Sequence, residues 1–385
     1  MRLSGFLTIV LLVFAGLCAE VRAQDAETAA FITLLGNDTL AVERFEVTPS
    51  GLTAEVVLRT PQTTYRRYDI RFDDQGGLER FESVIHDGGA DADELRREVV
   101  TPTAGGLLIA SSADDDATER TAEIDDSAFP FIDMVHWPFE LALRNVAGRG
   151  VDSTVVPMFT GRGAIPFVFR RAGSGGMTIQ HPFRGVMDVE VDAAGRLVHL
   201  DAGQTTRKLT VTRVDDVDPV AVAARFVAED QAGRSFGALS GRGEFATTVG
   251  DANITIDFGQ PSKRGRDIWG ALVPFGELWR TGANLATHIT TDRTLEFNGT
   301  VVEPGTYTLF SIPEGDGGVL IISSQTGQNG NSYNPEHDLG RVPMHVQPLD
   351  DVVEDFLIDA VPAPEGGQLR LLWDRTAYII PFAIR

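Results

Sequence analysis

The strongest constraint on the fold is a succession of short β-type runs that fills most of the chain. Between residues 38 and 213 these runs are rich in β-branched and aromatic residues, and clusters of Pro, Gly and Asp such as residues 73–77 separate them. From Arg66 to Phe72 the side chains alternate, with Tyr68 and Ile70 on the apolar face and charged residues on the other. This pattern predicts antiparallel strands with one packed and one wet face, and about ten such runs predict a strongly curved sheet or a half-barrel.

Two segments break the β pattern and predict short helices. Pro138 is tolerated in a first helical turn and can open a helix that runs through Val146. Asp218 can cap a second helix over residues 219–231, in which Pro219 takes the first position and Gly233 supplies the stop. The Gly-, Ser- and Arg-rich residues 233–243 are then a linker.

After residue 243 the chain is β-type again. Asn298-Gly299 is a strong two-residue hairpin signal, and the uninterrupted apolar run Val319–Ile322 predicts a central strand covered on both faces. Pro381 predicts that the last strand lies at a sheet edge, because proline cannot donate a ladder hydrogen bond. We expect a β-sandwich here, and an all-β, mainly antiparallel protein as a whole.

The amino terminus predicts export. Arg2 precedes an apolar run over residues 5–19, and Val21-Arg22-Ala23 offers small residues where a signal peptidase reads. The run spans about 22 Å as a helix, short of the roughly 30 Å of a hydrocarbon core, so we expect a cleaved signal peptide over residues 1–23 and no transmembrane anchor. Cleavage near Ala23 also removes Cys18, the single cysteine, and leaves a disulfide-free protein in the periplasm or outside the cell.

These signals divide the chain into four parts. After the signal peptide we expect an N-terminal antiparallel β domain over residues 24–215 and a helix with linker over residues 216–242. A C-terminal β-sandwich follows over residues 243–385.

The charge balance excludes some partners. Acidic residues outnumber Lys and Arg by 55 to 33, which gives a formal net charge of −22. Phosphate backbones and anionic membrane surfaces are bound through an excess of Lys and Arg, so neither nucleic acid nor a membrane surface is an expected partner.

One segment gathers positive charge and aromatic residues in this acidic chain, and it is the candidate ligand-binding site. Trp and Arg anchor ligands by stacking and by forked hydrogen bonds, so the segment predicts a small anionic, sugar or lipid ligand. The candidate residues are Lys263, Arg266, Trp279, Arg280, Asn284 and Thr287. The alternative is structural, with Trp279 in the core and Arg280 bound to loop carbonyls or to Asp338.

No motif points to a metal, a cofactor or a catalytic group. The seven histidines lack metal-ligand spacing on one element, and no Gly-x-Ser-x-Gly is present. His288 lies nearest the candidate segment and is the one histidine in reach of a general-base role. Catalytic residues stay unassigned.

Residues 258–266, 270–274, 278–284 and 304–313 carry motifs that resemble the bacterial domain-of-unknown-function 2911 family. The resemblance covers about residues 243–385. It implies a domain boundary and no activity, cofactor or substrate.

Three functional readings follow. The first is a non-catalytic envelope protein, in which the curved sheet holds an apolar or amphipathic ligand and the C-terminal sandwich is a binding or interaction module. The second is an extracytoplasmic hydrolase or carbohydrate-active enzyme, whose two carboxylates meet only in the fold. The third is a purely structural surface protein.

Overall fold

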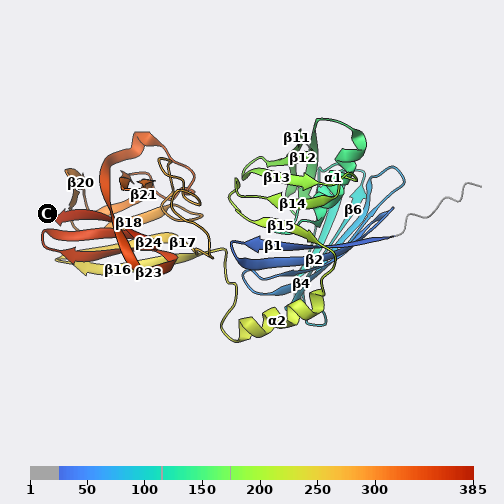
Figure 1. Cartoon of the computed structure of the whole chain (residues 1–385), viewed down its shortest axis with the longest axis horizontal. Coiled ribbons are helices and arrows are strands. Elements are labelled where there is room, and N and C mark those ends of the chain that lie inside the picture. The colour runs from blue at the N-terminus through green and yellow to red at the C-terminus, as the bar shows by residue number, and fades with distance from the viewer. Residues whose placement is uncertain (1–25, 114–115, 174) are drawn as a thin grey trace, which may run out of the picture.

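The computed structural model describes residues 26–113, 116–173 and 175–385, so the predicted signal peptide lies outside the described residues. The described part forms a 15-stranded sheet followed along the chain by a nine-stranded sheet (Figure 1). Nearly all strand pairs are antiparallel, which confirms the predicted fold class. No helix in the described part is long and apolar enough to cross a membrane.

The N-terminal sheet is a meander whose two arms are joined through β1 (Glu27–Leu35), which pairs with β15 (Thr210–Val214). From β1 to β8 and from β10 to β15, successive strands are antiparallel neighbours. The short β9 pairs in parallel with β10, so β8 and β9 form the two opposite edges of the sheet. The remaining strands are β2 (Asp38–Thr48), β3 (Gly51–Leu58), β4 (Thr64–Phe72), β5 (Leu78–Asp87), β6 (Glu94–Thr103), β7 (Gly106–Ala113), β8 (Asp116–Ala122), β9 (Phe129–Pro130), β10 (Ser153–Thr160), β11 (Gly163–Ala172), β12 (Gly176–His181), β13 (Gly185–Val191) and β14 (Leu197–Asp201).

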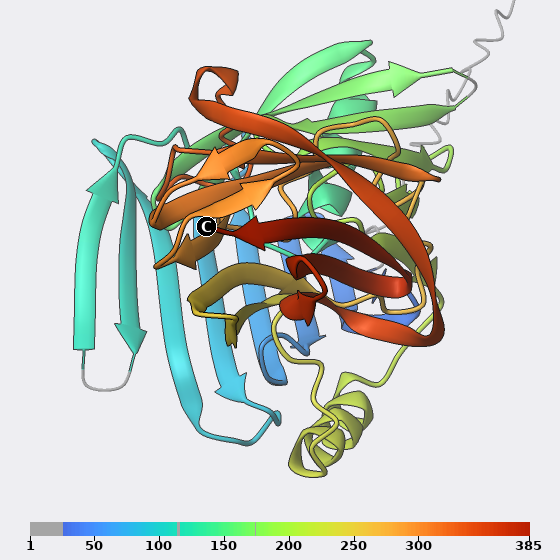
Figure 2. The same cartoon turned by 90° about the vertical axis from the view of Figure 1, so that its left-hand side faces the viewer.

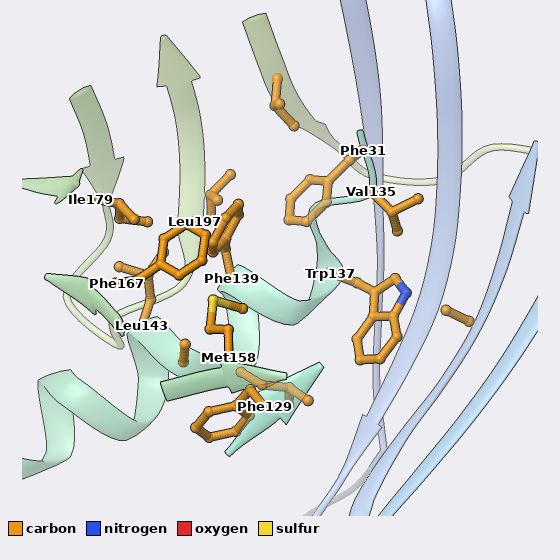
Figure 3. Packing of buried hydrophobic residues seen from close by; sticks show 14 of the residues in the cluster. Phe31, Phe129, Val135, Trp137, Phe139, Leu143, Met158, Phe167, Ile179 and Leu197 are labelled. Atoms are coloured by element: carbon orange, nitrogen blue, oxygen red, sulfur yellow. The ribbon is translucent and has the colours of Figure 1, made fainter. Parts of the chain in front are cut away.

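Helix α1 (Trp137–Arg149) packs into the core of this sheet. Phe139 and Phe167 face one another beside Leu197, while the fully buried Trp137 points to the other side (Figure 3). The first turn of α1 is held by a buried carboxylate, because Glu43 of β2 accepts hydrogen bonds from the backbone N–H groups of His136 and Trp137. The centre of the curved sheet is therefore filled by side chains.

Helix α2 (Pro219–Gln231) has the predicted bounds, and the Asp218 side chain caps it by accepting from the backbone N–H of Ala221. The helix lies against the outer face of β2 and β3, where Phe226 packs with Val57 and Tyr65 in a small separate core. This explains why Tyr65 is buried although it lies on the predicted wet face of β4.

The C-terminal sheet folds back on itself, because β16 (Ser240–Val249) and β17 (Ala252–Pro261) also contact β23 (Asp338–Ala363). Its core lies between these layers and includes Phe258, Phe356 and Trp373. The sandwich prediction is met by one continuous sheet rather than by two separate sheets. The other strands are β18 (Thr287–Thr291), β19 (Leu295–Phe297), β20 (Thr300–Val302), β21 (Gly305–Glu314), β22 (Gly317–Ser323) and β24 (Gly366–Ile384), and a 3-10 turn spans Pro335–His337.

The edge position predicted for the last strand is wrong. β24 lies between β23 and β19 in the sheet. Its register with β23 ends at Ile379 and its register with β19 begins at Ala383. Pro381 falls between these two stretches, so its missing N–H removes no ladder hydrogen bond.

The two sheets touch at a small junction. The β1–β2 turn at Gly36-Asn37 packs against Arg264-Gly265, and the backbone N–H of Asn37 donates to the Arg264 carbonyl oxygen at 3.0 Å. The Arg264 guanidinium donates to Asp38 Oδ2 at 2.9 Å. Viewed from the C-terminal side, the nine-stranded sheet lies in front of the N-terminal sheet, and α2 stands apart from it (Figure 2).

Candidate functional site

A pocket of about 370 Å³ lies between the two sheets, and we call it the interdomain pocket. Its walls are the β12–β13 and β14–β15 loops of the N-terminal sheet and the long β17–β18 loop of the C-terminal sheet. In Figure 1 the β17–β18 loop region occupies the side of the C-terminal sheet that faces the N-terminal sheet. The polar lining residues are Arg184, Gln204, Thr205, Thr206, Arg207, Lys208, Ser240, Arg266, Arg280, Asn284 and Asn331.

Five cationic side chains from both sheets line this pocket, and its lining contains no carboxylate. Arg184, Arg207 and Lys208 come from the N-terminal sheet, whereas Arg266 and Arg280 come from the β17–β18 loop. In a chain with a formal net charge of −22, this is a local reversal of sign.

Two of the five cations share one carboxylate. Asp133 accepts from Arg184 Nη1 at 2.5 Å and from Arg207 Nε at 3.2 Å. Burial acts to raise the pKa of Asp133, but the hydrogen bonds and charges of the two arginines outweigh it and lower that pKa. The carboxylate is thus ionised, and the group of three carries one net positive charge.

The other three cations have no salt-bridge partner among the residues described. Lys208 Nζ donates to the Gly203 carbonyl, and Arg266 donates to the carbonyls of Lys263 and Ser262. Arg280 donates to the Gly282 carbonyl and to the Asn331 side chain.

Burial acts on all three groups, and the positive charges of the other two act on Lys208. Burial together with the charges of Arg266 and Arg280 lowers the pKa of Lys208, although Glu277 partly offsets this. Burial also lowers the pKa of Arg266 and that of Arg280. Like charges gathered away from water raise the free energy of the empty pocket, and a bound anion removes that cost.

The structure brings four of the six predicted site residues together. Arg266, Trp279, Arg280 and Asn284 line the interdomain pocket. Lys263 lies elsewhere and forms an ion pair with Asp374 at 2.9 Å.

Thr287 is fully buried and donates to the Thr281 carbonyl, so it supports the loop backbone. The alternative pairing of Arg280 with Asp338 is wrong, since Asp338 accepts from Tyr333 and Arg341.

Trp279 has both a structural and a lining role. Its ring stacks on Trp373 with centroids 6.1 Å apart and meets Phe356 edge-on at 5.1 Å. Both tryptophans also line the pocket, so the core supplies the cations with a rigid apolar wall.

Sequence reasoning missed the half of the site that the N-terminal sheet provides. Arg184, Arg207 and Lys208 lie about 60 to 80 positions before the predicted segment and on different hairpin loops. The available signal was Lys208, one of only two lysines in the chain, directly after Arg207.

His288 does not reach the pocket. It lies on β18, where its Nε2 accepts from the backbone N–H of Gly327 at 3.2 Å. Burial lowers its pKa. In the described part of the chain, no three His, Cys, Asp or Glu side chains gather as they would around a metal ion.

A larger, open groove of about 540 Å³ runs along the outer face of β2 to β6. Three of its four carboxylates have partners: Glu55 accepts from the Tyr65 hydroxyl, Asp69 pairs with Arg71, and Glu82 pairs with Arg80 and Arg97. Such exposed ion pairs are typical of a solvated sheet face.

Comparison with known proteins confirms the C-terminal resemblance. Residues 240–382 match the family described as "Protein of unknown function (DUF2911)". No curated protein matches the chain.

Among solved structures, the chain is similar to a beta-barrel-like protein of domain of unknown function DUF1849 from Brucella abortus. The identity is 13%, the match covers 49% of this chain and 96% of that chain, and the TM-score is 0.34.

Proposed function

We propose that this is an exported, non-catalytic protein that binds a small organic anion in the interdomain pocket. The observation that carries the proposal is the convergence of Lys208, Arg266 and Arg280, which come from two sheets and have no carboxylate partner in the described part of the chain. Guanidinium and ammonium groups that share no acid within the protein are matched by carboxylate or phosphate oxygens from outside it.

The rest of the lining supports an organic rather than an inorganic anion. Trp279 and Trp373 form an apolar wall, and Asn284 and Asn331 offer amide groups beside the cations. Ligand sites commonly combine an apolar lining with a few polar groups that orient the ligand. The core of the N-terminal sheet is filled around α1, so it supports a lipid ligand less well.

Calorimetric titration tests the proposal. We expect the wild-type protein to bind succinate and glucose 1-phosphate, and the double variant Arg266→Gln/Arg280→Gln to bind them at least about tenfold more weakly, since two charge-assisted hydrogen bonds are lost. The control is the double variant Arg293→Gln/Arg375→Gln, which makes the same change in net charge at two other arginines of the C-terminal sheet. Arg293 is exposed and paired with Asp251. Equal affinities for the two double variants would refute the pocket as the anion site.

Export has its own test. We expect the protein isolated from its native host to begin at Gln24 and to lie outside the cytoplasm, because residues 21–23 form the proposed cleavage site. Sequencing of the amino terminus of the isolated protein measures this, and an intact Met1 in a cytoplasmic fraction would contradict it.

A further inference from the structure

A second, smaller pocket shares part of its lining with the interdomain pocket, and we call it the inner cavity. Arg184, Thr205 and Arg207 line both spaces. The rest of the inner cavity is mainly apolar and includes Phe131, Phe139, Met187 and Leu209 from the core of the N-terminal sheet. Its volume is about 40 Å³.

His181 is one of the residues that line this cavity, and it carries an unpartnered donor. The residue is only 5% exposed, and its Nδ1 accepts from the backbone N–H of Phe183 at 3.1 Å. A neutral imidazole that accepts at Nδ1 carries its proton on Nε2. That Nε2 is buried and meets no hydrogen-bond partner.

The surroundings keep this histidine neutral and in place. Burial and the charge of Arg184 lower the pKa of His181 to about 4. Phe167 and Phe131 hold the ring edge-on, with centroids 4.8 and 5.5 Å away. A buried N–H donor costs free energy as long as no acceptor meets it.

The mainly apolar lining decides what kind of acceptor fits. Arg184 and Arg207 share the Asp133 carboxylate, which also lines the inner cavity, so both arginines already have an anionic partner and the group of three keeps one net positive charge. An ionised group among the apolar lining residues would lose its hydration for one hydrogen bond from the neutral His181, whereas a neutral oxygen loses much less hydration there. One water needs about 10–15 Å³ of such space, so the inner cavity has room for a group of several atoms.

We propose that the inner cavity is a second binding subsite, which takes a compact, mostly apolar neutral group whose one acceptor oxygen is bound by His181 Nε2–H. This inference rests on the proposed function. One ligand then occupies both pockets: its anionic end lies on the cations of the interdomain pocket, and its carbonyl-bearing end lies in the inner cavity. The ligand class is then a small acid with a neutral carbonyl group remote from its acidic end. The same subsite chemistry would also accept a separate small ketone.

Matched probes test the subsite. 4-Oxopentanoate and pentanoate differ by one ketone oxygen, and butanone carries the ketone without the acid. We expect the full-length wild-type protein to prefer 4-oxopentanoate over pentanoate by about tenfold in calorimetric titration, the effect of one hydrogen bond to a buried donor. In nitrogen-15 NMR of histidine-labelled protein, the Nε2–H resonance of His181 should shift when the ketone binds.

The variant His181→Asn removes the Nε2 donor. It leaves a side-chain oxygen that can accept from the Phe183 N–H, in the role of Nδ1. We expect this variant to bind both acids with equal affinity, close to the wild-type affinity for pentanoate. Thermal unfolding of the variant verifies that it folds, and the NMR measurement needs only the wild-type protein.

The outcomes separate the two proposals. If neither acid binds to the wild-type protein but butanone shifts the His181 resonance, the subsite stands and the anion site fails. If both acids bind equally, and neither 4-oxopentanoate nor butanone shifts the His181 resonance, the anion site stands and the subsite is overturned. A preference for 4-oxopentanoate that persists in His181→Asn also overturns the role of His181.

Discussion

At the scale of single residues, burial decides what each ionisable group does in this protein. Glu43 and His181 are both buried in the N-terminal sheet, yet Glu43 accepts from two backbone N–H groups and His181 Nε2 has no hydrogen-bond partner. The first contributes to the fold. His181 keeps its Nε2–H donor free, and a purely structural role does not require a free donor.

The lowered pKa of His181 predicts acid sensitivity. Its pKa falls from 6.5 in the unfolded chain to about 4 in the folded protein. Between these values the unfolded chain takes up a proton that the folded protein does not, so stability falls as the pH drops below 6.5. We expect the free energy of unfolding to decrease by about 2 kcal/mol more between pH 7 and pH 5 in wild type than in His181→Asn.

Urea unfolding at both pH values measures this difference. Other groups titrate alike in the two proteins, so the comparison isolates the histidine. Parallel pH profiles for wild type and variant would contradict a neutral, buried His181.

At the scale of elements, α1 depends on a contact from another strand. Its N-terminus has no side-chain cap of its own at His136, and the Glu43 carboxylate of β2 fills that role. A negative group at a helix N-terminus also interacts favourably with the helix dipole. The helix therefore owes part of its stability to residue 43, more than ninety positions away.

Replacement of that carboxylate should weaken the N-terminal sheet. We expect Glu43→Gln to lower the free energy of unfolding by about 2 kcal/mol, because the charge is lost and only one acceptor oxygen remains. Urea unfolding followed by tryptophan fluorescence measures it. Glu46→Gln, on the same strand and only half-buried, is the control and should cost much less; an equal loss in both would argue against the capping role.

Helix α2 offers a simpler case, since its cap is local. Asp218→Ala should cost about 1 kcal/mol, the usual worth of an N-cap side chain. The neighbouring Asp215 is exposed and lies outside the helix, so Asp215→Ala should leave the unfolding midpoint unchanged.

At the scale of the whole molecule, the interdomain pocket depends on how the two sheets meet. The junction is narrow and rests on the close approach of Gly36 to the Arg264 carbonyl. Gly36 has φ of 62°, and an added Cβ would overlap that oxygen. The relative position of the cations from the two sheets thus depends on this junction, which lies outside the pocket.

Gly36→Ala should separate the sheets. We expect a larger radius of gyration in small-angle X-ray scattering and at least about tenfold weaker anion binding. The reason is that the pocket walls from the two sheets no longer lie at the distance that lets both contact one anion. Gly76→Ala is the matched control, because Gly76 also has positive φ in a hairpin turn but has open space where its Cβ would lie. Equal effects of the two substitutions would show that backbone strain, and not the junction, is responsible.

The sequence by itself determined the local elements. Alternation and turn residues were enough for many of the strands, and Asp218-Pro219 was enough for the bounds of α2, because such signals act over a few residues. About ten strands were predicted between residues 38 and 213, whereas the N-terminal sheet has 15 and begins with β1 at Glu27. The sequence also identified Arg266, Trp279, Arg280 and Asn284 as a candidate set. Only the tertiary structure decided that Arg207 and Lys208 lie in the same pocket as Arg266 and Arg280, that Lys263 lies outside it, and that His181 lines the inner cavity. These are contacts between loops of different sheets, and no local pattern encodes the distance between residues that meet only when two sheets dock.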